Sequence, residues 1–294
     1  MSQIVSQIAG QGSTTVRTAT TALITGASSG LGAEFAAQLA ARGHDLVLVA
    51  RSEDRLHDLA KRLGEAHGIT AHVLVQDLSA PDAAHRVGAE LADRGLAVDL
   101  LVNNAGFGTC GPFETIDGQR DHDQLMVNVV ALVDLTHELL PGMLARGGGS
   151  VINVSSTASF QPTPYLAVYG ASKTFVLNFS LALRQEYRRR GIRVLAFCPG
   201  PVETEFFNVI GTRKAAVTGS FATVGPVVRA ALRALDADRA YVVPGLANQL
   251  SAHLTPRRPR TLVAAIAERL SRGVRDAMAG GGAERREPSG ERVA

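Results

Sequence analysis

Short apolar runs alternate with longer amphipathic stretches along most of the chain. The runs Thr21–Thr25 and Asp45–Ala50 are of strand length and lead into turn residues, whereas Glu53–His67 carries apolar residues at helical spacing. Further strands are expected at 71–76, 98–102, 150–156, 192–198 and 241–243, and further helices at 33–42, 81–94, 125–145, 169–190 and 225–235. Strands and helices that alternate in this way predict an α/β fold with a doubly wound parallel sheet.

The two ends of the chain do not continue this pattern, which leaves 21–245 as one folded domain. Residues 1–20 are small and polar and predict a flexible N-terminal extension, while 280–294 are rich in glycine and charge and predict a disordered tail. Residues 246–279 predict a C-terminal helical extension with an amphipathic helix at 261–278. Because Pro256–Arg260 precede it, this helix could lie on a membrane surface or a partner subunit, although packing on its own domain is the more ordinary interpretation.

Composition supports a globular protein and limits the class of partner. Apolar residues make up 46% of the 294 residues and charged residues 19%, which provides for a sizeable core. The formal net charge is +3, and much of the basic excess lies in short runs such as Arg188–Arg190, Arg257–Arg258 and Arg285–Arg286. We interpret these runs as solvated helix ends and tails, so no nucleic-acid partner is expected.

Cysteine usage and hydropathy predict a soluble cytoplasmic protein. Cys110 and Cys198 are the two cysteines, too few for a disulfide framework. The eight histidines show no metal-ligand spacing, so no metal site is expected. The longest apolar stretches are interpreted as too short and too interrupted to span a bilayer, and the first twenty residues lack the apolar run of a signal peptide.

A glycine-rich loop joins the first expected strand to the first expected helix. It runs from Gly26 to Gly32 and has a third glycine, Gly30, between them. Glycine lets the backbone approach a pyrophosphate closely, and the unpaired N–H groups at the start of a helix attract an anion. Alone, this spacing would also suit an ordinary strand-to-helix turn. Its position between a strand and a helix favours a dinucleotide-binding loop.

The residues after the second and third expected strands indicate which dinucleotide binds. Arg51 stands where dinucleotide folds carry an acid for a ribose hydroxyl or an arginine for a 2′-phosphate. Arg51 therefore favours NADP over NAD, the alternative being a solvated arginine at a strand end. Asp77 follows the third strand, where its carboxylate could meet an adenine amino group, cap the next turn, or do both.

The candidate chemistry centres on Tyr169 and Lys173. They are four residues apart on a predicted helix and so lie one turn apart on the same face. A phenol normally ionises near pH ~10, and a nearby ammonium is expected to lower the pKa of Tyr169 toward neutrality. Ser156, at the end of the fifth expected strand, can offer its hydroxyl to the same carbonyl oxygen. A Tyr–Lys pair alone is usually surface decoration, so the surrounding motifs decide the interpretation.

Further segments follow strands and converge on the same edge of the predicted sheet. They are Asn103–Gly106 after the fourth strand and Pro199–Gly200 after the sixth, on either side of Ser156 after the fifth. Open parallel sheets bind ligands at this edge, where the strand order reverses. The two asparagines could also simply cap the end of their strand. The convergence of these segments predicts a single site.

Two segments near this edge leave alternatives open. Asn128 lies in a helix that is apolar nearly all round, which implies burial on more than one side. A buried amide there needs partners and either makes a local bond or serves the site. Residues 205–224 are irregular and could form a lid over an apolar substrate or pack on the core. The apolar side chains of this segment are Phe206, Phe207, Ile210 and Phe221.

Taken in order, these motifs closely resemble those of the short-chain dehydrogenase/reductase family. The matching pieces, spread over about residues 20–245, are Thr25–Gly32, Asp77–Leu78, Asn103–Gly106, Asn128, Ser156, Tyr169–Lys173, Pro199–Gly200 and Thr204. The resemblance implies a Rossmann-type sandwich with a seven-stranded parallel sheet, the catalytic domain at 21–245. It also implies that Tyr169 donates a proton and that Ser156 orients the carbonyl. Lys173 would bind the nicotinamide ribose and lower the pKa of Tyr169, and Asn128 would hold a relay water.

The same resemblance implies the cofactor and the residues that hold it. NADPH is expected in preference to NADH. The expected cofactor contacts are Gly26, Ser28, Ser29, Gly30, Leu31, Gly32, Arg51, Asp77, Leu78, Asn104, Ala105, Gly106, Tyr169, Lys173, Pro199, Gly200, Val202 and Thr204.

The expected activity is hydride transfer from NADPH to a ketone or an aldehyde. The segment Val243–Asn248 resembles the branch of the family that reduces long-chain oxoacyl groups and steroids, which favours an apolar substrate. Two alternatives stay open: an alcohol dehydrogenase that works in the oxidising direction, and a sensor that binds NADP without turnover. The resemblance also implies a homodimer or homotetramer whose interface is formed by the helices of Asn128 and Tyr169.

Overall fold

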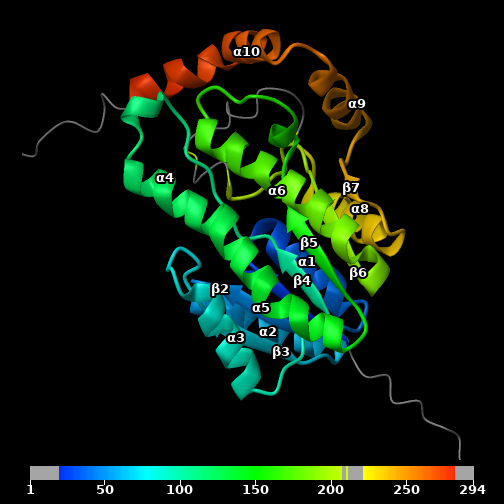
Figure 1. Cartoon of the computed structure of the whole chain (residues 1–294). Coiled ribbons are helices and arrows are strands. Elements are labelled where there is room, and N and C mark those ends of the chain that lie inside the picture. Colours follow the sequence, from blue (N-terminus) through cyan, green and yellow to red (C-terminus); the bar gives the residue numbers. More distant parts are fainter. Residues whose placement is uncertain (1–19, 207–209, 211–220, 282–294) are drawn as a thin grey trace, which may run out of the picture.

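The computed structural model describes residues 20–206, 210 and 221–281. Its centre is a sheet in the order β3-β2-β1-β4-β5-β6-β7, with every neighbouring pair parallel (Figure 1). The strands are β1 (Thr21–Thr25), β2 (Asp45–Ala50), β3 (Ala71–Val75), β4 (Leu100–Asn103), β5 (Gly149–Val154), β6 (Ile192–Phe197) and β7 (Tyr241–Val242). The predicted seven-stranded, Rossmann-type sheet is confirmed.

Several expectations fall on parts of the chain outside the described residues. These are the flexible extension, of which only Thr20 is described, and the tail, of which only residues 280 and 281 are described. Residues 207–209 and 211–220 of the expected lid also lie outside them, and Phe207 is among these.

The strand order reverses between β1 and β4. β2 and β3 are added on one side of β1, whereas β4 to β7 extend the sheet on the other side. The connections that leave β1 and β4 therefore run in opposite directions. A crevice forms beyond the carboxyl ends of these two strands, which is where ligands bind in open α/β sheets.

Helices cover both faces of the sheet (Figure 1). One core contains residues of α1 (Gly30–Ala40), α2 (Glu53–His67) and α8 (Val224–Asp236), and the other contains residues of α3 (Ala83–Asp93), α5 (Ala131–Ala145) and α6 (Ala167–Tyr187). Successive residues of β1 supply the two cores in turn, because Leu23 packs in one and Ile24 in the other. Burial on both faces explains why the strands are continuous apolar runs in the sequence.

The helix expected at 125–145 begins earlier, at Gly118. Asp117 caps α4 (Gly118–Leu125), because its carboxylate accepts a hydrogen bond from the backbone N–H of Gln119 at 3.0 Å. The chain continues through a π-helical turn, η2 (Met126–Val130), into α5. The apolar pattern does not reveal the start of this helix because α4 is mostly polar. Asp117, a residue type that commonly caps helices, was the signal in the sequence that could have indicated it.

This continuous helix is long and apolar enough, by length and composition, to cross a membrane, so the expectation that no apolar stretch reaches that limit was wrong. In the folded domain, Leu135 and Met143 of α5 are buried in the sheet core. Only a third of the most apolar part of the helix is buried, on the side that faces the domain. The helix nevertheless packs on more than one side, as its apolar pattern predicts, against the sheet, α3 and α6.

Two helices follow β7 at the end of the molecule opposite α3 (Figure 1). They are α9 (Leu246–Leu254) and α10 (Arg260–Gly281), joined through the 3-10 turn η6 (Thr255–Arg257). The Tyr165 hydroxyl donates a hydrogen bond to the carboxylate of Glu268 at 3.2 Å. This bond ties α10 to the segment that precedes α6.

Candidate active site

The glycine loop and the start of α1 form a cradle for an anion. α1 begins at Gly30, three residues before the expected start at Ala33. Within the described residues, the side chain of its N-cap Ser29 makes no capping bond and its first turn holds no acidic residue, so its N–H groups stay open to an anion. Gly26 adopts a φ of +65°, and a Cβ on Gly32 would lie 2.1 Å from the carbonyl oxygen of Gly26. The loop geometry therefore fits a pyrophosphate.

Thr25 and Asn104 fix the ends of the two central strands together. The Thr25 hydroxyl accepts hydrogen bonds from the backbone N–H groups of Asn104 and Ala105, both at 2.9 Å. The side-chain amide of Asn104 donates to the carbonyl oxygens of Thr25 at 2.8 Å and of Gly26 at 3.3 Å. Asn104 thus holds the strand end and the glycine loop together. It also lines the cleft described below, so the structural and the ligand-facing interpretations are compatible.

Charged groups gather where β2 and β3 end. Arg51 is exposed, and Asp77 accepts hydrogen bonds from the backbone N–H of Ser79 at 2.9 Å and from the Ser79 hydroxyl at 2.8 Å. Partial burial acts to raise the pKa of Asp77, but these two bonds and the charge of Arg51 together hold it below its ordinary value. The capping role of Asp77 is therefore confirmed.

Arg55 stands beside Arg51, and the sequence analysis missed it. Its Nη1 lies 3.1 Å from a carboxylate oxygen of Glu205, and both side chains are exposed. This ion pair bridges α2 and the segment after β6, across the end of the cleft that Arg51 lines. The spacing of four residues from Arg51 was the signal that could have found Arg55.

Ser156, Tyr169 and Lys173 meet on one wall of the cleft. Ser156 follows β5 and caps the 3-10 turn η3 (Thr157–Phe160), because its hydroxyl accepts from the N–H of Ala158 at 3.1 Å. The same hydroxyl is hydrogen-bonded to the phenol of Tyr169. Lys173 Nζ lies 5.8 Å from the centroid of the Tyr169 ring and donates to the carbonyl oxygen of Val154 at 2.9 Å.

Burial controls the charge of these two titrating groups. It raises the pKa of Tyr169 to about 12, and the hydrogen bond to Ser156 offsets only part of this effect. The expected lowering of the tyrosine pKa was therefore wrong for the protein without ligands. Burial also lowers the pKa of Lys173 to about 8, and the neighbouring Cys198 opposes only part of this effect. At neutral pH, Tyr169 thus carries its proton and most Lys173 side chains are charged.

Asn128 is buried in the π-helical turn η2. Its Oδ1 accepts from the backbone N–H of Phe107 at 3.1 Å, and its Nδ2 donates to the carbonyl oxygen of Phe107 at 2.9 Å and to the Ser172 hydroxyl at 3.1 Å. These bonds place Asn128 in a local structural role, holding the loop after β4 against α6. A Cβ on Gly106 would lie 2.8 Å from Asn128 Oδ1 and 3.3 Å from Lys173 Nζ, so the amide borders the site. Its relay role stays a prediction.

The segment after β6 closes the opposite side. The N–H of Thr157 donates to the carbonyl oxygen of Pro199 at 2.9 Å, which joins the ends of β5 and β6. Gly200 packs against α9, since a Cβ there would lie 2.4 Å from Nδ2 of Asn248. Thr204 lies over the glycine loop, 3.1 Å from the position of a Cβ on Gly30.

These groups line one cleft of about 1370 Å³. All the predicted cofactor and tetrad positions line it except Gly32 and Asn128, which support it from behind. Ligand pockets commonly measure about 300–1,000 Å³. The larger volume here leaves room for a second molecule beside a dinucleotide.

The rest of the cleft is largely apolar and comes from the segment of the expected lid and from α9 and α10, which the sequence analysis did not place at the site. Phe206 packs on Tyr169 with their ring centroids 5.3 Å apart, and Ile210 is buried beside them. Both residues also line the cleft, so they agree with either alternative for this segment. The helices α9 and α10 contribute further apolar lining, namely Ala247, Ala252, Val263, Ile266, Ala267 and Leu270. Periodicity reveals α10 as a helix, but not that it lies over the site.

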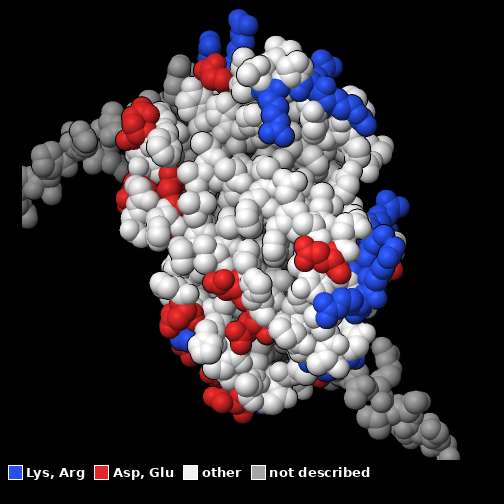
Figure 2. Space-filling model, in the orientation of Figure 1, with Lys and Arg blue, Asp and Glu red and all other residues white. Residues whose placement is uncertain are grey.

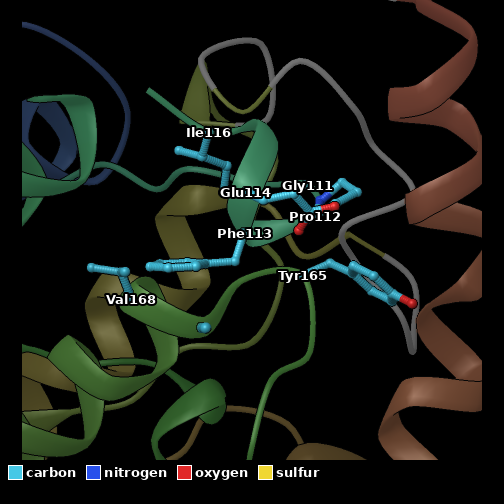
Figure 3. A pocket seen from close by; sticks show the side chains of 8 residues that line it. Gly111, Pro112, Phe113, Glu114, Ile116, Tyr165 and Val168 are labelled. Atoms are coloured by element: carbon cyan, nitrogen blue, oxygen red, sulfur yellow. The ribbon is translucent and has the colours of Figure 1, made fainter. Parts of the chain in front are cut away.

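A smaller hollow of about 360 Å³ is lined by other residues (Figure 3). Its wall consists of Gly111, Pro112, Phe113, Glu114, Ile116, Tyr165, Ala167 and Val168. Tyr165 has a φ of +66°, and its side chain extends toward α10. The hollow contains none of the predicted site residues and is separate from the chemistry above.

Comparison with known proteins finds relatives that are dehydrogenases and reductases. The model of the short chain dehydrogenase family matches residues 20–215. The very-long-chain 3-oxoacyl-CoA reductase of Anas platyrhynchos is 36% identical over 193 residues, which make up 64% of this chain and 61% of that protein. Sulfoacetaldehyde reductase 2 of Chromohalobacter salexigens is 39% identical over 186 residues, 63% of this chain and 73% of that protein. The chain thus spans less than two thirds of the length of the first of these reductases.

Solved structures match over nearly the whole chain. A short-chain dehydrogenase from Sphingobium yanoikuyae in complex with NADPH is 31% identical with a TM-score of 0.73, covering 93% of this chain and 98% of that one. The bulky-bulky ketone specific alcohol dehydrogenase from Comamonas testosteroni is also 31% identical, with a TM-score of 0.69 over 93% of this chain and 97% of that one.

Proposed function

The chain belongs to the short-chain dehydrogenase/reductase family and is an oxidoreductase, and from this we propose that it reduces a ketone or an aldehyde with NADPH. The observation that carries the proposal is the wall formed by Ser156, Tyr169 and Lys173. It lies in the same cleft as the glycine loop and Arg51. One bound cofactor could therefore reach both ends of this cleft.

The chain's own groups fit NADPH, which when bound supplies the hydride. The open N-terminus of α1 suits the pyrophosphate, and the Arg51 and Arg55 side chains suit a 2′-phosphate. Lys173 stands where a nicotinamide ribose could accept its remaining N–H groups. The bound NADPH of the Sphingobium relative supports this assignment.

Tyr169 is the proposed proton donor. Its pKa of about 12 keeps the phenol protonated at neutral pH, as a general acid requires. In the reduction, the carbonyl carbon gains the hydride and the carbonyl oxygen gains the Tyr169 proton, which gives the alcohol. The phenolate left behind lies near the Lys173 ammonium, which stabilises it until it takes up a new proton. The Ser156 hydroxyl, already bonded to the phenol, orients the carbonyl oxygen.

We propose a bulky, apolar carbonyl compound as the substrate. Phe206, Ile210 and Leu166 lie beside Tyr169, and α10 adds apolar residues above them. The Comamonas relative is specific for bulky-bulky ketones, and the duck relative reduces very-long-chain 3-oxoacyl-CoA. Both names describe large, partly apolar carbonyl compounds.

The test is the rate of NADPH consumption with a panel of carbonyl compounds. The panel holds a ketone with two large apolar substituents, acetone, an aldehyde and a long-chain 3-oxoacyl thioester, each also run with NADH. We expect turnover with NADPH that is faster for the bulky members than for acetone. Tight NADPH binding without turnover of any member, or of an alcohol with NADP⁺, would instead favour the sensor. Faster turnover with NADH would contradict the assignment of Arg51 and Arg55 but not the chemistry.

A further inference from the structure

The helix α9 exposes apolar side chains on the face that points away from the cleft. Leu246, Leu250 and Leu254 recur every four residues and are 86%, 61% and 44% exposed. None of the three lines the cleft, whereas Asn248, Ser251 and Ala252 of the same helix do. A bound substrate would therefore leave this leucine stripe uncovered.

A second stripe continues along α10. Leu262, Ile266 and Leu270 have the same four-residue spacing, and each is about half exposed. Ile266 and Leu270 also line the mouth of the cleft. Exposed apolar side chains scattered singly are ordinary, but two successive helices with ordered stripes mark an interaction surface.

The charge of this segment is strongly one-sided. Residues 246–273 hold five arginines, at 257, 258, 260, 269 and 272, and one acidic residue, Glu268. All five arginines are exposed. Figure 2 shows Lys and Arg side chains gathered over the end of the molecule where α9 and α10 lie, with little negative charge among them. The whole chain carries a net charge of only +3, so the excess here is local.

We propose that α9 and α10 dock the protein on an anionic lipid surface. An amphipathic helix with a basic polar side lies in the plane of such a surface, with its apolar side among the acyl chains. The apolar stripes of α9 and α10 supply the apolar contact, and the arginines of 257–272 meet the anionic headgroups. The mouth of the cleft, at Ile266 and Leu270, then faces the lipid. This inference rests on the surface alone and not on the reaction.

The charge pattern decides between a lipid surface and other occupants. A second copy of this chain would bring the same arginines against one another, which opposes association at this surface. If a segment outside the described residues covered the stripes, the protein would not bind vesicles, and the vesicle experiment separates that arrangement from the proposal.

The test measures co-sedimentation of the full-length protein with vesicles of phosphatidylcholine alone and with vesicles that contain phosphatidylglycerol. The first variant replaces Leu246, Leu250 and Leu254 by Ser. Its matched control replaces two exposed apolar residues elsewhere, Val75 and Phe113, by Ser. A second pair of variants compares Arg257→Ser/Arg260→Ser with Arg188→Ser/Arg189→Ser, an equal change of charge on another exposed surface. Circular dichroism checks that every variant is folded.

We expect binding to the anionic vesicles that weakens with added salt. The triple α9 variant should bind at least tenfold more weakly, and the Arg257/Arg260 variant about fivefold more weakly per arginine lost. Both matched controls should bind like the wild type. The proposal is overturned if the wild type does not bind the anionic vesicles, or if the α9 variant and its control lose binding equally.

Discussion

At Tyr169, burial raises the pKa of the phenol, and the hydrogen bond to Ser156 acts to lower it. Sequence spacing identifies Tyr169 and Lys173 as a pair, but it cannot say how deeply the phenol is buried. In the structure burial wins, and the pKa of Tyr169 rises to about 12. The raised value suits a residue that must hold its proton until a carbonyl oxygen is ready to take it. A phenol that keeps its proton is what the proposed reduction requires of Tyr169.

Removal of the phenol tests this role. Tyr169→Phe keeps the ring that packs on Phe206 and removes the proton that we assign to catalysis. We expect kcat to fall by about 100- to 10,000-fold, the usual contribution of general acid catalysis, with NADPH affinity changed by less than about threefold. Steady-state rates and a direct binding titration measure the two quantities. A kcat within a factor of ten of the wild type would show that another group supplies the proton.

Lys173 gives the reaction a pH dependence of known sign. Burial lowers its pKa to about 8, so the ammonium is present below that value and is lost as the pH rises through it. Because the ammonium stabilises the phenolate, we expect the rate to be full near pH ~7 and to fall above pH ~8. A pH–rate profile measures the fall, and Lys173→Met should be slow and should lack it. A wild-type rate that rises across this range would contradict the assignment.

The π-helical turn η2 shows how one element supports the site through the hydrogen bonds of a single side chain. It inserts Asn128 into the space between the loop after β4 and α6, where the amide satisfies both backbone groups of Phe107. Turns of this kind often occur at functional sites. Their cost in regular hydrogen bonding is offset here by the bonds that the side chain makes.

Asn128→Ala should therefore destabilise the fold. The change removes the partner of the half-buried N–H and carbonyl of Phe107 and the buried bond to the Ser172 hydroxyl, and an unsatisfied buried group costs about 1–3 kcal/mol. Urea unfolding measures the free energy, and Asn178→Ala is the control. Asn178 is exposed on α6 and donates only to the carbonyl oxygen of Thr174, so its loss should cost less than about 0.5 kcal/mol. Equal losses of unfolding free energy in the two variants would mean that the bonds of Asn128 stabilise the fold no more than an exposed bond does.

How well each element could be predicted depended on the physical signal that it carries. The strands were found because burial on both faces makes them continuous apolar runs, as in Leu46–Ala50. The start of α4 was missed because its eight residues are mostly polar, and only the cap at Asp117 marks it. The predicted site residues line one cleft because Gly26, Asn104 and Ser156 follow strand ends, and the Tyr169–Lys173 pair was marked by its helical spacing. Arg55 was missed although it follows Arg51 by four residues, because its ion pair with Glu205, 150 residues further along the chain, forms only in the folded protein.

The oligomeric state is the property that the sequence predicts least directly. Exposed Leu125 lies at the end of α4 and exposed Phe175 on α6, where the Phe175 and Phe179 rings stack with their centroids 5.9 Å apart. One side of the helix 118–145 also stays largely uncovered. These apolar surfaces favour a subunit interface over a membrane-spanning role, because the other side of the helix belongs to the sheet core.

We accordingly expect a dimer or tetramer of the 30.9 kDa chain. Phe175→Asp should shift the mass toward the monomer in sedimentation equilibrium, because it places a charge in an apolar interface. Val75→Asp, an equally exposed apolar position on β3, should leave the mass unchanged. A monomeric wild type at every concentration would contradict this interface. The cytoplasmic location stays a prediction, supported by the two free cysteines of the described residues.

The position of α9 and α10 over the cleft was also beyond sequence reasoning. Periodicity gives a helix and its apolar side, but the partner of that side depends on contacts between distant segments. Here the bond from Tyr165 to Glu268 and the packing of Asn248 against Gly200 place both helices. The apolar end of the cleft, and with it the size of the substrate, follows from that placement.

The most direct test follows the hydride from NADPH into the alcohol product. The protein would reduce a bulky ketone with NADPH that carries deuterium at the transferable position of the nicotinamide, and mass spectrometry and NMR would locate the label. We predict one deuterium on the new carbinol carbon of each product molecule, with the hydroxyl proton drawn from solvent through Tyr169. An alcohol product without deuterium at that carbon, or no alcohol from any ketone that binds, would contradict the proposed hydride transfer.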